Sequence, residues 1–185
     1  MTDRDATTPS ASELLPPSLR LLFVGINPGL SSDALGSPFA PRSNRFWPAL
    51  HAAGILERRI DASAGLTPDD RDHLFARGVG ITSLVHRATA AAAELDAAEL
   101  VTGARRLRRL VDELRPVVVA VLGITAYRQA FADRHAVVGR QPDGMGPAEL
   151  WVVPNPSGRN AHTTLAELAT SYREVAEAAG ILDGE

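Results

Sequence analysis

Two asparagine–proline turns carry the side chains of this sequence that are best suited to chemistry. The first is Gly25-Ile26-Asn27-Pro28-Gly29 and the second is Asn155-Pro156-Ser157-Gly158, and each follows an apolar run of strand length. Glycine allows close backbone approach and proline fixes φ, so both turns should be rigid. They supply amides, a hydroxyl and backbone N–H groups, and Arg159 adds a cation. Such groups suit the binding of a neutral heterocycle and the orientation of water better than acyl or phosphoryl transfer.

Composition excludes several other chemistries. The 185 residues include no cysteine, which rules out disulfides, thiolate clusters, cysteine zinc sites and cysteine nucleophiles in this sequence. The five histidines are scattered without the close spacing of a metal site, so we expect neither a metal nor a cofactor. The net charge of −3 argues against a protein that coats a polyanion. A small footprint of a few arginines on DNA remains compatible with it.

Four apolar runs are predicted to be strands, and helical patterns separate them. Strands joined through helices form a parallel sheet that is covered on both faces. We therefore predict one α/β domain over residues 19–185, a three-layer α/β/α sandwich around a central, mainly parallel four-stranded sheet. The expected strands are 21–24, 79–85, 117–122 at the centre, and 150–153.

Capping patterns predict where two helices begin. Ser43 or Asn44 precedes one helix, and Thr163 or Thr164 precedes the last helix, where Glu167 would complete a capping box. A long amphipathic helix is expected over 95–114, with a basic face exposed to solvent that consists of Arg105, Arg106, Arg108 and Arg109.

The amino-terminal segment and the absence of long apolar runs indicate the location. Residues 1–18 are polar and contain proline, so we expect a flexible tail rather than a secretory signal. No apolar run approaches the ~20 residues that are needed to cross a membrane. We expect a cytoplasmic protein that works as a monomer.

The predicted topology brings the chemistry together. Parallel strands end at one edge of the sheet, where open α/β sheets bind ligands, so the two turns should lie close together. The loop 31–44 is long enough to be functional. Within it, Phe39 stands between two prolines, where an aromatic residue is expected to cover a pocket or a core edge. His86 follows the second strand and is either a hydrogen-bonded loop residue or a catalytic base.

Four segments resemble the mismatch-specific uracil-DNA glycosylases and their eukaryotic relatives, the thymine-DNA glycosylases. These segments are Gly25 to Ser32, Pro38-Phe39-Ala40, Asn44-Arg45-Phe46-Trp47 and Asn155 to Gly158, and the resemblance spans roughly residues 19–179. It implies a monofunctional enzyme of base excision repair. Such an enzyme flips uracil or thymine mispaired with guanine out of double-stranded DNA and hydrolyses the N-glycosidic bond, which leaves an abasic site.

The resemblance also implies roles for individual residues. Asn27 takes the place of the residue that positions the attacking water. The backbone around Gly25 and Ile26 would bind the base edge, Phe39 would stack on the base, and Asn155 would line the pocket.

The remaining implied contacts are to the DNA itself. Ser157 would contact a phosphate, and Gly158-Arg159-Asn160 would form the wedge that enters the stack behind the flipped base. Arg42 and Arg45 would join Arg159 in a cationic rim suited to a DNA backbone.

Three positions depart from the family pattern. Arg159 occupies the wedge, where bacterial members carry Leu and thymine-DNA glycosylases carry Arg. Ser83 stands where relatives have Lys or Asn, and His86 stands where they have Asp or Glu. The dependence on guanine, the preferred base and the acceptance of single strands or U·A pairs therefore stay open.

Two other classes of function also fit the residues. One is a damage-binding protein that hydrolyses poorly, because an asparagine replaces a carboxylate. The other is a nucleotide or nucleoside enzyme that uses the same sheet edge, whose activity would be insensitive to salt.

Overall fold

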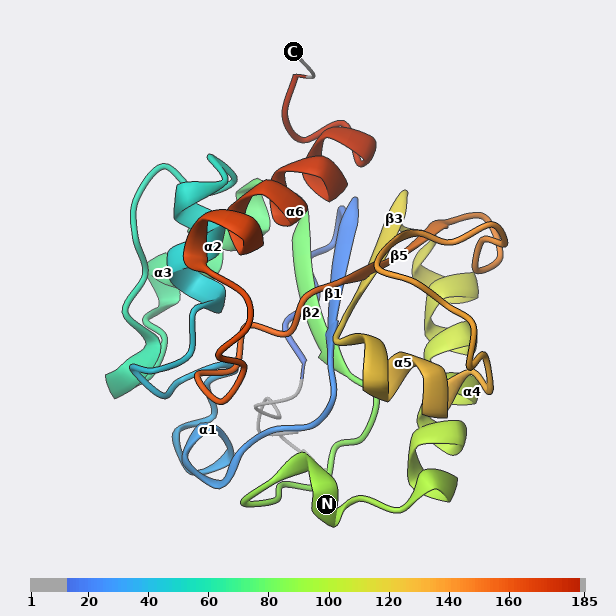
Figure 1. The fold of residues 1–185 in the computed structure, drawn as a ribbon. Helices are drawn as coiled ribbons and strands as arrows, with labels where there is room; N and C mark the ends of the chain where they lie inside the picture. Colours follow the sequence, from blue (N-terminus) through green and yellow to red (C-terminus); the bar gives the residue numbers. More distant parts are fainter. Residues whose placement is uncertain (1–12, 184–185) are drawn as a thin grey trace, which may run out of the picture.

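A five-stranded sheet forms the centre of the computed structural model, which describes residues 13–183 (Figure 1). The strands are β1 (Leu21–Gly25), β2 (Val79–Ser83), β3 (Val118–Leu122), β4 (Gly139–Arg140) and β5 (Glu149–Val153). Their order across the sheet is β2-β1-β3-β5-β4, and β4 runs antiparallel to β5 while the other pairs are parallel. The run 117–122 thus forms the central strand, as predicted.

The sheet differs from the prediction at one edge. The fifth strand, β4, has only two residues, Gly139 and Arg140, which pair with Val152 and Trp151. Two residues are too few to show a strand pattern in the sequence. The prediction of four strands is therefore short by one, because pairing across the sheet creates β4.

Helices cover both faces of the sheet and confirm the three-layer α/β/α sandwich. Successive residues of β1 face opposite sides, so Phe23 belongs to one apolar core and Val24 to the other. The helices are α2 (Phe46–Ala52), α3 (Pro68–Ala76) and α6 (Leu165–Ala178) on the first face and α4 (Ala97–Leu114) and α5 (Ile124–Ala130) on the second (Figure 1).

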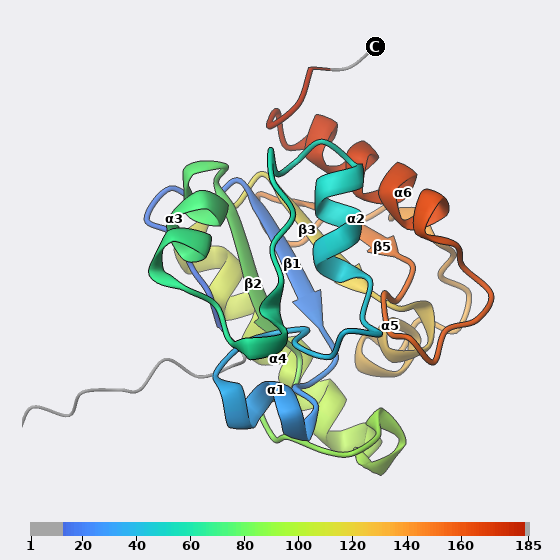
Figure 2. The same ribbon diagram turned by 90° about the vertical axis from the view of Figure 1, so that its left-hand side faces the viewer.

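The segment predicted as the loop 31–44 begins with a short helix, α1 (Leu30–Leu35). Gly36 ends it with a φ of +58°, and its N–H donates to Asp33 O at 3.1 Å. Six residues are too few for helical periodicity to be visible in the sequence. In Figure 2 the arrow of β1 ends beside α1, so the helix lies at the carboxyl edge of the sheet.

The predicted cap of the last helix is confirmed, whereas the cap of α2 lies one residue beyond the predicted Ser43 or Asn44. Thr164 Oγ1 accepts a hydrogen bond from Glu167 N, and the Glu167 carboxylate accepts one from Thr164 N, which completes the predicted capping box. Asn44 Oδ1 accepts a hydrogen bond from Phe46 N at 2.9 Å, while Arg45 occupies the cap position of α2. The backbone N–H and the hydroxyl of Thr164 both donate to the Glu167 carboxylate, and these hydrogen bonds hold the pKa of Glu167 below its usual range.

The described part of the predicted tail packs on the sheet. Leu14 N and Ile81 N each donate to the carbonyl oxygen of the other residue at 2.8 Å, and Leu14 is buried. Residues 13–18 thus lie against β2, the edge strand, rather than loosely as predicted. Residues 1–12 of that tail lie outside the described residues.

Arg106 does not lie on a solvated face, and that prediction is wrong for this residue. Its Nη1 donates to Glu13 Oε1 at 3.0 Å, and its Nη2 donates to Ser83 O. The same Glu13 oxygen accepts from Thr82 Oγ1 at 3.0 Å. The partners of Arg106 are distant in sequence, so helical periodicity alone could not reveal them.

Within residues 13–183, no helix combines the length and apolar character needed to cross a bilayer.

Candidate active site

An open cleft of about 1260 Å³ lies at the carboxyl edge of the sheet. Its walls come from the first turn, the segment 38–44, the beginning of α5 and the second turn. Nine of the eleven residues predicted for the site line this cleft, and the two that do not are Arg42 and Arg45. Both asparagine–proline turns therefore face one space, as the carboxyl ends of parallel strands should.

Backbone hydrogen bonds join the first turn to the segment that follows β2. Leu84 N donates to Gly25 O and Val85 N donates to Ile26 O, both at 2.9 Å. Thr89 N donates to Pro28 O at 3.2 Å. The first turn is thus held along its length by residues about 60 positions away, which makes it a rigid support for the Asn27 side chain.

The amide of Asn27 has a defined orientation. Nδ2 donates to Thr89 Oγ1 at 2.8 Å and to Arg87 O at 2.9 Å, and Pro28 O lies 3.3 Å away. Carbonyl oxygens only accept hydrogen bonds, so the nitrogen rather than the oxygen of the amide must face them. Among the described residues, none donates a hydrogen bond to Asn27 Oδ1. This oxygen is therefore available to accept a hydrogen bond from a water molecule in the cleft.

Thr89 is a functional residue that the sequence interpretation missed. Its hydroxyl accepts from Asn27 Nδ2 and donates to Ala91 O at 2.8 Å, and the residue is buried. Both roles of the hydroxyl are therefore used. The signal was present as a threonine in the polar run after β2, but its partner is 62 positions away in the sequence.

Phe39 forms an aromatic wall of the cleft with a constrained backbone. Its φ is +56°, which is rare for a bulky residue and costs roughly 1–3 kcal/mol. Trp47 Nε1 donates to Pro38 O at 3.0 Å, and Ala40 N donates to Ser32 Oγ at 3.1 Å, so the peptides on both sides of Phe39 are anchored.

The ring of Phe39 stacks on a core aromatic residue. Its centroid lies 4.1 Å from that of Phe46, with an interplanar angle of 28°. Phe46 is fully buried and Phe39 is half-buried. A Cβ atom at Gly25 would lie 3.3 Å from Phe39 Cζ and 3.4 Å from Ser83 Oγ, so this glycine keeps the floor of the cleft open between them.

The second turn is organised by its own polar side chains. Asn155 Oδ1 accepts from Ser157 N at 2.9 Å, and Ser157 Oγ accepts from Arg159 N at 3.3 Å. Asn160 Nδ2 donates to Asn155 O at 2.9 Å and to Thr163 Oγ1 at 3.2 Å. Asn160 therefore holds the turn closed, while Arg159 projects from it as an exposed side chain.

Gly158 lies against the segment before α2. A Cβ atom at Gly158 would lie 2.8 Å from both Ser43 Cβ and Ser43 O. Any larger residue would have to displace backbone, so the close approach of the two segments requires glycine at this position.

Arg45 braces the second turn from within the protein. Its guanidinium donates to Asn160 O at 2.7 Å, to Ser157 O at 3.1 Å and to Thr163 O. Its backbone N–H donates to Pro156 O at 3.0 Å. The expectation that Arg45 belongs to a cationic rim facing DNA does not match this geometry, because both terminal nitrogens of its guanidinium donate to backbone carbonyls.

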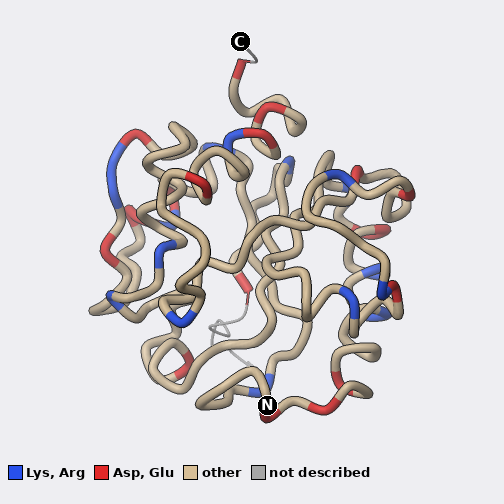
Figure 3. Tube along the Cα trace, in the orientation of Figure 1, with Lys and Arg blue, Asp and Glu red and all other residues tan. Residues whose placement is uncertain are grey.

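Arg42 and Arg159 are the predicted cations that remain exposed. The Arg42 side chain is 82% exposed and lies 3.7 Å from Asp61. In the view of Figure 3, basic and acidic residues are interspersed along the trace. Any electrostatic attraction of DNA to the cleft therefore depends on a few local arginines rather than on the net charge.

Ser83 and His86 lie in different environments. Ser83 is buried and lines the cleft, with Oγ at its floor. His86 is not among the described residues that line the cleft, and its Nε2 lies 3.4 Å from Glu13 Oε1. Burial, and then the charge of Arg106, lowers the pKa of His86, while Glu13 opposes this shift. The neutral imidazole therefore prevails at pH 7, away from the cleft.

The cleft is suited to recognising a flat heterocycle beside an oriented water molecule. Among the described residues, no group of three or more histidines, aspartates and glutamates is placed to hold a metal ion. The lining residues also include no carboxylate. The amides, hydroxyls and backbone N–H groups that line the cleft can act by orientation and by electrostatic stabilisation.

Comparison with known families identifies the class of protein. The model of the uracil DNA glycosylase superfamily matches residues 12–178. The chain therefore belongs to the uracil DNA glycosylase superfamily, whose members are hydrolases of N-glycosyl bonds in DNA that act on uracil.

Proposed function

We propose that this protein excises uracil, and more slowly thymine, from mispairs with guanine in double-stranded DNA. The reaction is hydrolysis of the N-glycosidic bond, and its products are a free base and an abasic site. The two turns that resemble the mismatch-specific enzymes, and their position on one cleft, support this specificity.

The orientation of the Asn27 amide is the observation that carries the proposal. Three oxygen atoms surround Nδ2, so Oδ1 is the atom left to accept a hydrogen bond from water. A neutral amide orients water but does not take its proton at neutral pH. Cleavage of the glycosidic bond must then run ahead of water attack, through a sugar with oxocarbenium character.

This mechanism has a consequence for the rate. Because no general base assists the water, the departing nucleobase must carry the negative charge that develops as the glycosidic bond breaks. We therefore expect slow turnover that rises with the acidity of the leaving group, so that 5-fluorouracil leaves faster than uracil and thymine leaves more slowly.

The base is held by stacking and by the backbone. One face of Phe39 packs on Phe46, so the other is available to stack on a flipped base. Such stacking contributes ~1–3 kcal/mol and is tolerant of the kind of base. Peptide groups from Gly25 to Asn27 supply the donors and acceptors for its polar edge.

The preference for guanine is assigned to Arg159. An exposed arginine at the tip of the second turn can fill the space left by the flipped base. Its guanidinium can also donate to O6 and N7 of guanine, a contact worth ~1–3 kcal/mol of discrimination where it is bidentate.

The reaction stops at the abasic site. The sequence contains 19 lysine and arginine residues, and all of them are arginine. A lysine amine can form a Schiff base with the sugar aldehyde of an abasic site, which leads to strand cleavage. With no lysine side chain in the sequence, we expect hydrolysis of the N-glycosidic bond without cleavage of the DNA strand.

The test is single-turnover cleavage of matched oligonucleotides that carry U·G, U·A, T·G or single-stranded U, with alkali to reveal abasic sites. The proposal predicts cleavage of U·G first, T·G more slowly and U·A least among the duplexes. The Arg159→Ala variant should narrow the ratio of U·G to U·A rates.

Other results would redirect the assignment. Equal rates on all four substrates would indicate a general uracil glycosylase without mismatch preference. Binding to U·G duplex without any cleavage at stoichiometric enzyme would indicate a damage-binding protein instead.

A further inference from the structure

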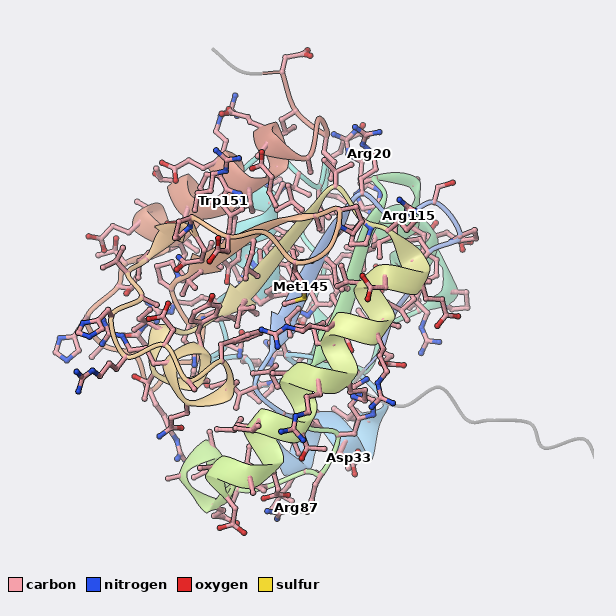
Figure 4. All side chains as sticks on the ribbon, turned by 90° about the vertical axis from the view of Figure 1, so that its right-hand side faces the viewer. Arg20, Asp33, Arg87, Arg115, Met145 and Trp151 are labelled. Atoms are coloured by element: carbon pink, nitrogen blue, oxygen red, sulfur yellow. The ribbon has the colours of Figure 1, made fainter. Side chains whose placement is uncertain are left out.

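A bidentate ion pair lies behind the cleft. Arg87 Nε donates to Glu99 Oε1 and Arg87 Nη2 donates to Glu99 Oε2, both at 2.9 Å. Arg87 Nη2 also donates to Glu94 O at 3.2 Å. Figure 4 shows Arg87 near the amino-terminal end of α4. Two parallel hydrogen bonds fix the direction of the guanidinium as well as its distance.

The carboxylate of this pair is anchored on a long helix. Glu99 lies in the first turn of α4, and its Oε2 accepts a hydrogen bond from Asp96 N at 2.9 Å in a capping box. The hydrogen bond from Arg87, followed by that from Asp96 N, lowers the pKa of Glu99 to about 2. Both hydrogen bonds favour the charged form of the carboxylate.

The other end of Arg87 reaches the candidate catalytic group. Arg87 O accepts a hydrogen bond from Asn27 Nδ2 at 2.9 Å. Arg87 thus links two parts of the protein: its side chain binds Glu99 of α4, and its carbonyl oxygen binds the Asn27 amide in the cleft. Arg87 is not among the described residues that line the cleft, so its side chain acts away from the base.

We propose that Arg87 and Glu99 are positioning residues for hydrolysis of the N-glycosidic bond, because their ion pair holds the Arg87 carbonyl that orients the Asn27 amide. This inference rests on the proposed function of Asn27. Without the ion pair, the carbonyl can turn away and the amide can rotate, so that Oδ1 no longer faces the water for part of the time. The loss should appear in the chemical step and not in DNA binding.

The competing explanation is a direct contact with DNA. The Arg87 side chain is 51% exposed, and an exposed arginine could instead bind a phosphate. A lysine would preserve a phosphate contact, whereas it cannot reproduce the two-pronged hydrogen bonding to Glu99. Arg87→Lys therefore separates the two explanations, and Glu99→Gln adds a change that removes no positive charge.

The experiment measures single-turnover rates on U·G duplex and the affinity for product duplex at several salt concentrations. The variants are Arg87→Lys, Arg87→Gln, Glu99→Gln and the double variant Arg87→Gln/Glu99→Gln. Arg109→Gln, an exposed arginine further along α4, is the control for charge. Exposed ion pairs contribute little to global stability, so all variants should remain folded.

We expect each change in the pair to lower the rate by about tenfold, as removal of supporting hydrogen bonds does in other sites. The double variant should be no slower than either single variant, because both remove the same support. The Arg87→Gln variant should bind product duplex with the same affinity and the same salt dependence as the control variant Arg109→Gln. A full rate for Arg87→Lys or Glu99→Gln, or additive losses in the double variant, would overturn the proposal.

A second measurement does not depend on activity. The side-chain amide resonance of Asn27 in a ¹⁵N-labelled sample should show slow hydrogen exchange in the wild type and faster exchange in Glu99→Gln. Equal exchange in both would contradict the proposed support. If the wild type cleaves no uracil substrate, the proposed function fails, and this exchange measurement still decides whether the ion pair orients the amide.

Discussion

Asn27 Nδ2 lies 2.8 Å from Thr89 Oγ1, and this contact joins the first turn to the segment after β2. The hydroxyl that accepts this bond donates its own hydrogen to Ala91 O. The direction of the Asn27 amide is therefore set by groups that cannot reverse their roles without losing a hydrogen bond.

Replacement of Thr89 tests this relationship. Thr89→Val keeps the shape but removes the acceptor for Asn27 Nδ2 and the donor to Ala91 O. We expect a loss of about 1–3 kcal/mol in the free energy of unfolding, because the residue is buried. We also expect a rate on U·G duplex about tenfold lower, as for other supporting hydrogen bonds. Thr89→Ser, which keeps the hydroxyl, is the matched control and should retain most of the rate. A fully active Thr89→Val enzyme would exclude this role.

Phe39 provides the test of base stacking. Phe39→Leu should weaken binding of the flipped base by ~1–3 kcal/mol, since a branched aliphatic residue offers no flat π-face. The measurement is the affinity for a duplex that carries a non-cleavable 2′-fluoro-deoxyuridine opposite guanine. Phe75→Leu, in α3 and away from the cleft, makes the same change in side chain and should bind normally. Equal weakening in both variants would point to general loss of packing.

Arg42 and Arg45 are close in sequence but should respond differently. Arg45→Ala removes the donors to three backbone carbonyls within residues 157–163, so we expect destabilisation and faster hydrogen exchange over residues 155–163. Arg42→Ala should leave stability within about 0.5 kcal/mol, because this side chain is exposed. If Arg42 contacts a phosphate, its loss should reduce the salt dependence of DNA binding by about one ion. The reverse pattern would show that Arg45, and not Arg42, faces DNA.

The ionisation of Glu99 predicts how stability depends on pH. Its pKa in the folded protein is lowered from 4.5 to about 2. A carboxyl group with a lowered pKa stabilises the fold above its unfolded pKa, and this contribution disappears as the pH falls through the folded value. Unfolding experiments between about pH 5 and pH 2 should therefore show a weaker pH dependence of stability for Glu99→Gln than for wild type. Identical profiles would contradict the ion pair in solution.

The strands and the cleft were predictable because they depend on local patterns and general topology. Buried parallel strands read as continuous apolar runs, and their carboxyl ends meet at one edge. The positions of Asn27 and Asn155 at one cleft follow from these two rules. Phe39 was identified because an aromatic residue between prolines in a loop has few structural explanations.

The support of the site was not predictable because its contacts are distant in sequence. Arg45 reads as a surface cation until residues more than 110 positions away provide carbonyl acceptors for it. Arg106 likewise reads as part of a solvated helix face until Glu13 packs beside it. Thr89 and Arg87 gain their roles only when the segment after β2 folds over the first turn. The short elements α1 and β4 were missed because they are too small to show a period.

The most direct test of the role of Asn27 compares wild type with Asn27→Ala on U·G duplex under single-turnover conditions. The rate of the variant should be at least about a hundredfold lower, since it loses the group that orients water. Product affinity should stay within about threefold of wild type, because stacking and DNA contacts lie elsewhere. The unfolding midpoint should fall, because the variant loses the hydrogen bonds from Asn27 Nδ2 to Thr89 Oγ1 and Arg87 O. A variant that binds DNA and cleaves U·G at the wild-type rate would contradict the central role of Asn27.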